Sequence, residues 1–199
     1  MIRSVRALGR ELVQNQARFF LVVSLAALGL RILLVLYFPA VSDDSRFYAD
    51  IAQNWLRHGV YAITNSGVIT PTLARLPGYP AFLAAIFAVF GAGNFRAVLL
   101  LQVLFDLATC FLIADLASRL FSPRAAKAAF LLAAFCPFLA NYAAAALTET
   151  LEIFFTTLAL DFAFRGLGIG DLETPAAPRY LPWLGCGLAI GGAILLRPD

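Results

Sequence analysis

Long apolar runs separated by short polar segments cover most of the chain. The first run is Phe19–Phe38, in which Arg31 is the only charged residue. A helix of this length crosses the roughly 30 Å hydrocarbon core of a bilayer, and it is longer than the apolar part of a cleaved signal peptide. The pattern therefore predicts a first transmembrane helix that is not removed. Four further spans are predicted at Ala97–Ser118, at about 128–141 with a break at Pro137, at about 145–164, and at Tyr180–Leu196.

The segment between the first two runs, about residues 39–96, contains an amphipathic pattern. Within Ser42–His58 apolar residues recur every fourth position, and Ser42 or Asp43 is placed to cap the start of a helix. This pattern predicts a helix that lies in the membrane interface. Its apolar side would hold Phe47, Ile51 and Trp55, and its polar side would hold Asp50, Asn54 and Arg57.

Two shorter features follow in the same segment. Residues 64–80 are rich in glycine and proline and predict turns. Ala81–Phe90 is apolar, but ten residues rise only about 15 Å as a helix, so this stretch predicts an interfacial or re-entrant helix. We therefore expect residues 1–199 to form one all-α, polytopic membrane module with about five transmembrane helices and interfacial helices in the outer loop 39–96.

Composition narrows the class of protein. Of the 199 residues, 61% are hydrophobic and 14% are charged, whereas a soluble domain is about 45–50% apolar and about 25% charged. This difference excludes soluble enzymes, disordered chains and nucleic-acid-binding proteins. Cys110, Cys136 and Cys186 lie in apolar stretches without metal-ligand spacing, so we expect small buried hydrophobes rather than a disulfide or a zinc site.

Basic residues are unevenly distributed between the two sides of the predicted spans. With a cytoplasmic N-terminus, the short inside segments hold nine of them and the long outer loop holds four. Cytoplasmic loops are enriched in Lys and Arg, so the pattern predicts that the N-terminus is cytoplasmic. The inside residues are Arg3, Arg6, Arg10, Arg18, Arg119, Arg124, Lys127, Arg165 and Arg179, and the outer ones are Arg46, Arg57, Arg75 and Arg96.

Two ionisable residues lie deep within predicted spans. Counted from the outer ends of the first and second spans, Arg31 and Asp106 lie at depths that differ by only a few ångströms. A charge at such a depth is functional or is paired. We expect Arg31 to pair with Asp106, or with Glu152, and the pair would either fix helix packing or serve function.

Carboxylates near the outer membrane surface are the main candidates for chemistry. Asp43 and Asp44 follow the first span and Glu149 precedes the fourth, so these side chains can converge on one extracytoplasmic site. Paired carboxylates can divide the work of a base and a cation ligand. The alternative is that Asp43 and Asp44 only cap the amphipathic helix and contact water.

The order of several short motifs resembles one membrane-enzyme family. Asp44–Ala52, followed by Trp55–Tyr61, is similar to the first outer loop of GT-C membrane glycosyltransferases. Among these enzymes it looks most like the bacterial protein mannosyltransferase-like and aminoarabinose transferase-like members. Later segments match in order: Arg75-Leu-Pro-Gly-Tyr79 resembles an R-x-P-x-Y motif, Thr148-Glu149 a second outer acidic motif, and Gly187 to Pro198 a Gly-Leu-Ala…Leu-x-Arg-Pro stretch.

The resemblance implies a reaction and roles for individual residues. A sugar would pass, with inversion, from a polyprenyl-phosphate donor to a glycan, lipid or protein acceptor on the outer side of the plasma (inner) membrane. Asp44 matches the catalytic aspartate, and because Ser45 follows it, Asp43 would supply the second carboxylate. Glu149 would position the acceptor or help hold a divalent cation; no resident metal or other cofactor is assigned. The substrate-binding candidates are Tyr48, Tyr79 and the phosphate-binding arginines Arg75, Arg96 and Arg197.

Two other interpretations stay open at this point. A transporter or flippase would use Arg31, Asp106 and Glu152 as an intramembrane ion path, but such proteins usually show paired repeats, and none is evident in the sequence. The third interpretation is a non-catalytic fragment. Members of the resembled family have more spans and a C-terminal periplasmic domain, so we expect this chain to correspond to their N-terminal part.

Overall fold

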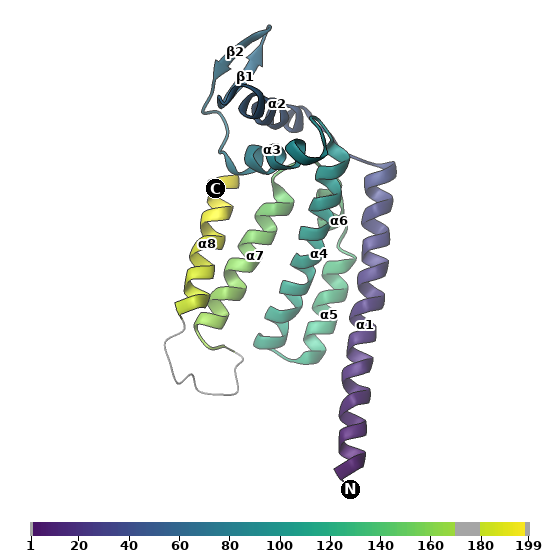
Figure 1. Ribbon diagram of the computed structural model, residues 1–199. Coiled ribbons are helices and arrows are strands. Elements are labelled where there is room, and N and C mark those ends of the chain that lie inside the picture. Colours follow the sequence, from purple (N-terminus) through teal and green to yellow (C-terminus); the bar gives the residue numbers. More distant parts are fainter. Residues whose placement is uncertain (1, 170–179, 198–199) are drawn as a thin grey trace.

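The computed structural model describes residues 2–169 and 180–197, and it is a helical bundle with a small cap at one end (Figure 1). Arg179 and Pro198, which belong to the predicted patterns, lie outside the described residues, as do the side chains of Arg3, Arg6 and Arg10. The described helices of the bundle are α1 (Ile2–Tyr37), α4 (Phe95–Leu120), α5 (Pro123–Ala134), α6 (Pro137–Ala143), α7 (Glu149–Gly166) and α8 (Tyr180–Leu196).

Four of the predicted spans correspond to single helices, and the remaining one is broken. Gln16–Tyr37 within α1 and the whole of α4 are long and apolar enough to cross a membrane. Helices α5 and α6 meet the same test only as a pair, with a 53° bend between them. Pro137 explains the break, because proline lacks the N–H of a helical residue and clashes with the preceding turn. Length and composition thus support two or three spans. In the bundle α7 packs between α4 and α8 (Figure 1).

The predicted interfacial helices form the cap. Helix α2 (Asp43–His58) starts at Ser42, whose side chain accepts a hydrogen bond from Ser45 N in a capping box, and it ends at Gly59 in the left-handed region. Helix α3 (Gly78–Phe90) begins three residues before the predicted apolar stretch. Both helices lie across the bundle at the same end as the C-terminal end of α8 (Figure 1).

The structure adds a β-hairpin that the expected all-α class did not include. Strands β1 (Ala62–Asn65) and β2 (Val68–Pro71) pair antiparallel. Ser66 and Gly67 connect them with positive φ values of 50° and 82°, the conformation of a two-residue hairpin turn that follows the strand twist. We call this end of the bundle, which carries α2, α3 and the hairpin, the hairpin end.

The hairpin also corrects the predicted faces of α2. Asn54 was placed on the polar side, but its side chain is buried and donates to Ala62 O at 3.1 Å and to Thr64 Oγ1 at 3.0 Å. Asp50 accepts a hydrogen bond from Thr64 N at 2.5 Å. Trp55, on the predicted apolar side, is partly exposed, and its ring packs edge-on against Tyr61 with 5.3 Å between centroids. The polar side of α2 binds the hairpin because its side chains satisfy backbone groups of β1.

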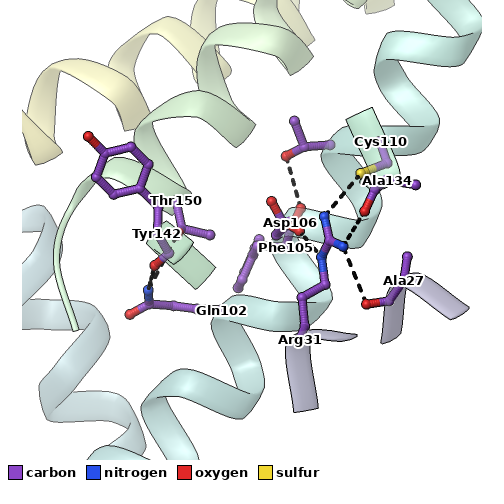
Figure 2. Close-up of polar contacts among 10 residues, drawn as sticks. Ala27, Arg31, Gln102, Phe105, Asp106, Cys110, Ala134, Tyr142 and Thr150 are labelled. Atoms are coloured by element: carbon purple, nitrogen blue, oxygen red, sulfur yellow. Dashed lines mark hydrogen bonds and ion pairs between the residues drawn. The ribbon is translucent and has the colours of Figure 1, made fainter. Parts of the chain in front are cut away.

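The bundle contains the intramembrane ion pair that the sequence predicted. Arg31 is fully buried and its Nε donates to the carboxylate of Asp106 (Figure 2). Its Nη1 donates to Ala134 O at 2.5 Å and to Ala27 O at 3.3 Å. Of the two predicted partners of Arg31, the structure therefore selects Asp106. The pair joins α1, α4 and α5, and it leaves neither buried charge unpaired.

Candidate functional site

A cavity of about 550 Å³ opens at the hairpin end, between the cap and the ends of α7 and α8. Four segments far apart in the sequence line it: the first turns of α2, the segment before α3, the start of α7 and the end of α8. The lining residues are Asp44, Tyr48, Leu73, Ala74, Arg75, Leu76, Leu147, Thr148, Glu149, Leu196 and Arg197.

Asp44 and Arg75 form an ion pair within the cavity. Arg75 Nη2 lies 2.8 Å from Asp44 Oδ1, and their side chains are 38% and 61% exposed. The Arg75 guanidinium also lies over the rings of Phe47 and Tyr48, 5.3 and 5.5 Å from their centroids. The hydroxyl of Tyr61 donates to Arg75 O at 2.9 Å. Tyr61, which directly precedes β1, therefore fixes the position of the backbone at Arg75. A pair this exposed adds little stability, and its groups remain accessible to a ligand.

Glu149 and Arg197 form a second, looser pair on the other wall. Arg197 Nη1 lies 4.0 Å from Glu149 Oε1. The other carboxylate oxygen, Glu149 Oε2, is buried and accepts no hydrogen bond from any described residue. A buried acceptor without a donor is costly.

Backbone contacts position the start of α7 relative to the end of α1. Ala40 N donates to Ala144 O at 2.9 Å, and Ala146 N donates to Ala40 O at 3.0 Å. These bonds form an isolated parallel bridge between Ala40 and Ala145. Because Asp44 follows Ala40 closely in the sequence and Glu149 follows Ala146, the bridge sets the two acidic walls of the cavity at a fixed separation.

Tyr79 lies beneath the cavity rather than on its surface. It is fully buried, its hydroxyl donates to Gln102 Oε1 at 2.9 Å, and its ring packs edge-on against Tyr48 with 5.1 Å between centroids. Burial raises the pKa of Tyr79 well above its usual value, and the nearby carboxylate of Glu149 acts in the same direction. Burial also raises the pKa of Tyr48, although Arg75 opposes the shift. Both phenols thus stay neutral hydrogen-bond donors at neutral pH.

Sequence reasoning missed Gln102, which supports the cavity from inside the bundle. Its side chain is fully buried in α4, and its Nε2 donates to Ala145 O at 2.7 Å. The same Nε2 also contacts Tyr142 O and Thr150 Oγ1, each at 3.4 Å (Figure 2). Together with its bond from Tyr79, Gln102 ties α3 and α4 to the backbone around Glu149. The available signal was the single amide side chain in the predicted span Ala97–Ser118.

The structure separates the predicted site residues into two groups. Five of them line one cavity: Asp44, Tyr48, Arg75, Glu149 and Arg197. Asp43 is exposed and does not line it, and Arg96 lines a different cavity beside α1 and α4. Glu152 lines an adjoining groove between α7 and α8, which it shares with Arg197.

The cavity presents carboxylates and guanidiniums but no metal centre. Among residues 16–169 and 180–197, no three His, Cys, Asp or Glu side chains gather as they would around a metal ion. The two arginines provide planar donors that suit a phosphate, and the carboxylates can accept a proton from a hydroxyl. This set of groups suits transfer between a phosphate ester and an alcohol.

Comparison with known proteins identifies one family. The model of the dolichyl-phosphate-mannose-protein mannosyltransferase family matches residues 71–199, more than half of the chain. That stretch includes Arg75, Glu149 and Arg197, while Asp44 precedes it. Neither the curated proteins nor the solved structures include a match.

Proposed function

The chain belongs to the dolichyl-phosphate-mannose-protein mannosyltransferase family of GT-C membrane glycosyltransferases, and from this premise we propose which reaction its cavity serves. The donor is a polyprenyl-phosphate sugar, and the acceptor is a hydroxyl of a glycan, lipid or protein. The hairpin end faces the extracytoplasmic side of the plasma membrane, in line with the basic residues predicted on the opposite side. Membership in this family favours the glycosyltransferase over the transporter considered from the sequence alone.

The observation that carries the proposal is the meeting of two carboxylates and two arginines in one cavity. Asp44 and Glu149 come from different helices, and each is close to an arginine of another segment. Arg75 and Arg197 would bind the donor phosphate through charge-assisted hydrogen bonds, which are shorter and stronger than neutral ones. Binding the phosphate would draw Arg75 away from Asp44 and leave that carboxylate available to the acceptor.

In the proposed step, the acceptor oxygen attacks the anomeric carbon while the bond from that carbon to the phosphate oxygen breaks. Asp44 takes the proton of the attacking hydroxyl. The leaving polyprenyl phosphate carries the displaced electron pair, and Arg75 and Arg197 stabilise its charge. The Glu149 carboxylate, which is partly exposed, accepts a hydrogen bond from the acceptor or the sugar and holds it in place. A single displacement of this kind inverts the anomeric centre.

A groove next to the cavity suits the apolar chain of the donor. It has a volume of about 370 Å³, lies between α7 and α8, and begins at Arg197. Small residues, among them Ala159 and Ala163 of α7, line it and leave room between the helices. Because Arg197 lines both spaces, a phosphate held in the cavity would be continuous with a chain that runs along the groove.

The proposal is tested with the full chain purified in detergent and reconstituted in vesicles. Polyprenyl-phosphate mannose serves as the donor probe, and both release of polyprenyl phosphate and binding of the donor are measured. We expect saturable donor binding that is lost when Arg75 and Arg197 are both replaced by glutamine. Binding that is unchanged in this double variant, with Arg57→Gln as the control for surface charge, would overturn the proposed donor site.

A further inference from the structure

A second cavity near the hairpin end lies on the side of the bundle that α1 and α4 form. It has a volume of about 560 Å³ and runs between α1 and α4. Leu28 and Ile32 form one wall and Leu100 and Leu104 the other, with Phe90 at the end of α3 closing one side. No residue lines both this groove and the cavity that holds Asp44.

The walls of the groove belong to the two helices that are long and apolar enough to cross a membrane. Leu28 and Ile32 are one helical turn apart, as are Leu100 and Leu104, so the groove runs parallel to the helix axes. Leu100 and Leu104 are 44% and 58% exposed. The groove is therefore open at the surface of the bundle, and it extends from the hairpin end by about 12 Å, from residue 96 to residue 104.

An arginine lies at the outer end of the groove. Arg96 is exposed in the first turn of α4, and within the described residues it forms no hydrogen bond and no ion pair. The first turn of α4 contains no acidic residue. The neighbouring Asn94 is already engaged, because its side chain caps the helix through Ala97 N and donates to Phe90 O. The positive charge of Arg96 is thus uncompensated at the end of a helix that is long and apolar enough to cross a membrane, the place where arginine side chains reach lipid headgroups.

We propose that this groove binds an anionic phospholipid of the surrounding bilayer. The lipid phosphate contacts Arg96, and one acyl chain lies along Leu28, Ile32, Leu100 and Leu104. An arginine binds a phosphate through two parallel hydrogen bonds, and the start of a helix adds a favourable field for an anion. A zwitterionic headgroup fits less well, because no carboxylate of the first α4 turn would accompany its ammonium group. This site is independent of the proposed glycosyl transfer.

Native mass spectrometry of the purified full chain tests the proposal. The protein is incubated with equal amounts of phosphatidylglycerol and phosphatidylethanolamine, and the lipid that remains bound is identified and counted. We expect the protein to retain phosphatidylglycerol in preference to phosphatidylethanolamine. In Arg96→Gln the amount of bound phosphatidylglycerol should fall about fivefold, which is the contribution of one basic residue to binding at an anionic membrane surface. Arg57→Gln, which removes another exposed outer arginine, should retain it fully.

A second variant tests the contribution of the groove to lipid binding separately from that of the Arg96 charge. Leu104→Trp keeps Arg96 and fills the groove from an exposed position, so it should lose phosphatidylglycerol while its thermal unfolding is unchanged. Equal retention by Arg96→Gln and the original chain would overturn the proposal, as would retention by Leu104→Trp. Preference for a polyprenyl phosphate over phosphatidylglycerol at this site would also overturn it and would assign the groove to the donor instead.

Discussion

Asp44 on α2 and Arg75 in the segment before α3 stand 31 positions apart in the sequence and form an ion pair of 2.8 Å in the site cavity. The pair links the residue proposed as the base to a residue proposed to bind phosphate. Because both side chains are partly exposed, we expect their contact to be exchangeable, so that a phosphate would replace the carboxylate as the partner of Arg75.

Replacing Arg75 by glutamine should weaken the binding of polyprenyl phosphate while leaving the stability of the fold almost unchanged. The free energy of unfolding is expected to fall by less than about 1 kcal/mol, because exposed ion pairs contribute little. Binding of polyprenyl phosphate should weaken about tenfold, the effect of losing about 1.4 kcal/mol of charge-assisted hydrogen bonding. Thermal unfolding and equilibrium binding on the same preparation check both values, and Arg75→Lys should retain part of the affinity. A large loss of stability with unchanged affinity would assign Arg75 a structural role only.

The Arg31–Asp106 pair should behave as a buried structural pair. Arg31→Leu leaves the Asp106 carboxylate buried without its partner, so we expect the free energy of unfolding to fall by about 3–5 kcal/mol. The double variant Arg31→Leu, Asp106→Leu removes both charges and should recover most of this loss. The free energies of unfolding of Arg31→Leu, of Asp106→Leu and of the double variant are measured in mixed detergent micelles. Additive losses in the double variant would contradict the proposed role.

Gly78 should be required for the close approach of α3 to the end of α8. A Cβ at this position would lie 2.6 Å from Leu195 O, a backbone atom that cannot move without shifting α8. Gly78→Ala is therefore expected to cost about 1–3 kcal/mol and to move Arg197 away from Glu149. Gly187→Ala provides the matched control in α8, because its Cβ would meet open space. Equal stability of the two variants would argue against this contact.

Alkaline pH should destabilise the protein through Tyr79. Burial raises the pKa of this phenol in the folded state, so between about pH 10 and the folded-state pKa the unfolded chain loses a proton that the folded chain keeps. The stabilising contribution is complete below about pH 10, and it is lost with rising pH by up to about 1.4 kcal/mol per pH unit. Tyr79→Phe should flatten this part of the stability profile, measured by thermal unfolding from about pH 8 to about pH 11. An unchanged slope in this variant would refute the assignment.

The position of a residue along a predicted helix could be inferred from the sequence. Helix rise fixes how far Arg31 and Asp106 lie from the ends of their spans, so their pairing could be inferred from the sequence alone. The direction in which a side chain points around its helix is less accessible. Arg96 was grouped with Arg75 and Arg197 from its position outside the spans, yet it lines a groove on another side of the bundle.

Other features depend on contacts that a single sequence does not encode locally. The four-residue strands β1 and β2 are too short to show a clear alternation, and α2 stabilises their hairpin through Asp50 and Asn54. The role of Gln102 follows from three segments that meet only in the folded bundle. The acidic and basic residues of the cavity could be predicted because short motifs carry them, but their pairing could not.

The most direct test of the account is sugar transfer by Asp44→Asn in a preparation in which the unchanged chain is active. We predict that transfer from polyprenyl-phosphate mannose falls by about 100-fold or more, as expected for loss of a general base, while donor binding persists through Arg75 and Arg197. Full transfer by Asp44→Asn would contradict the assignment of this carboxylate as the base.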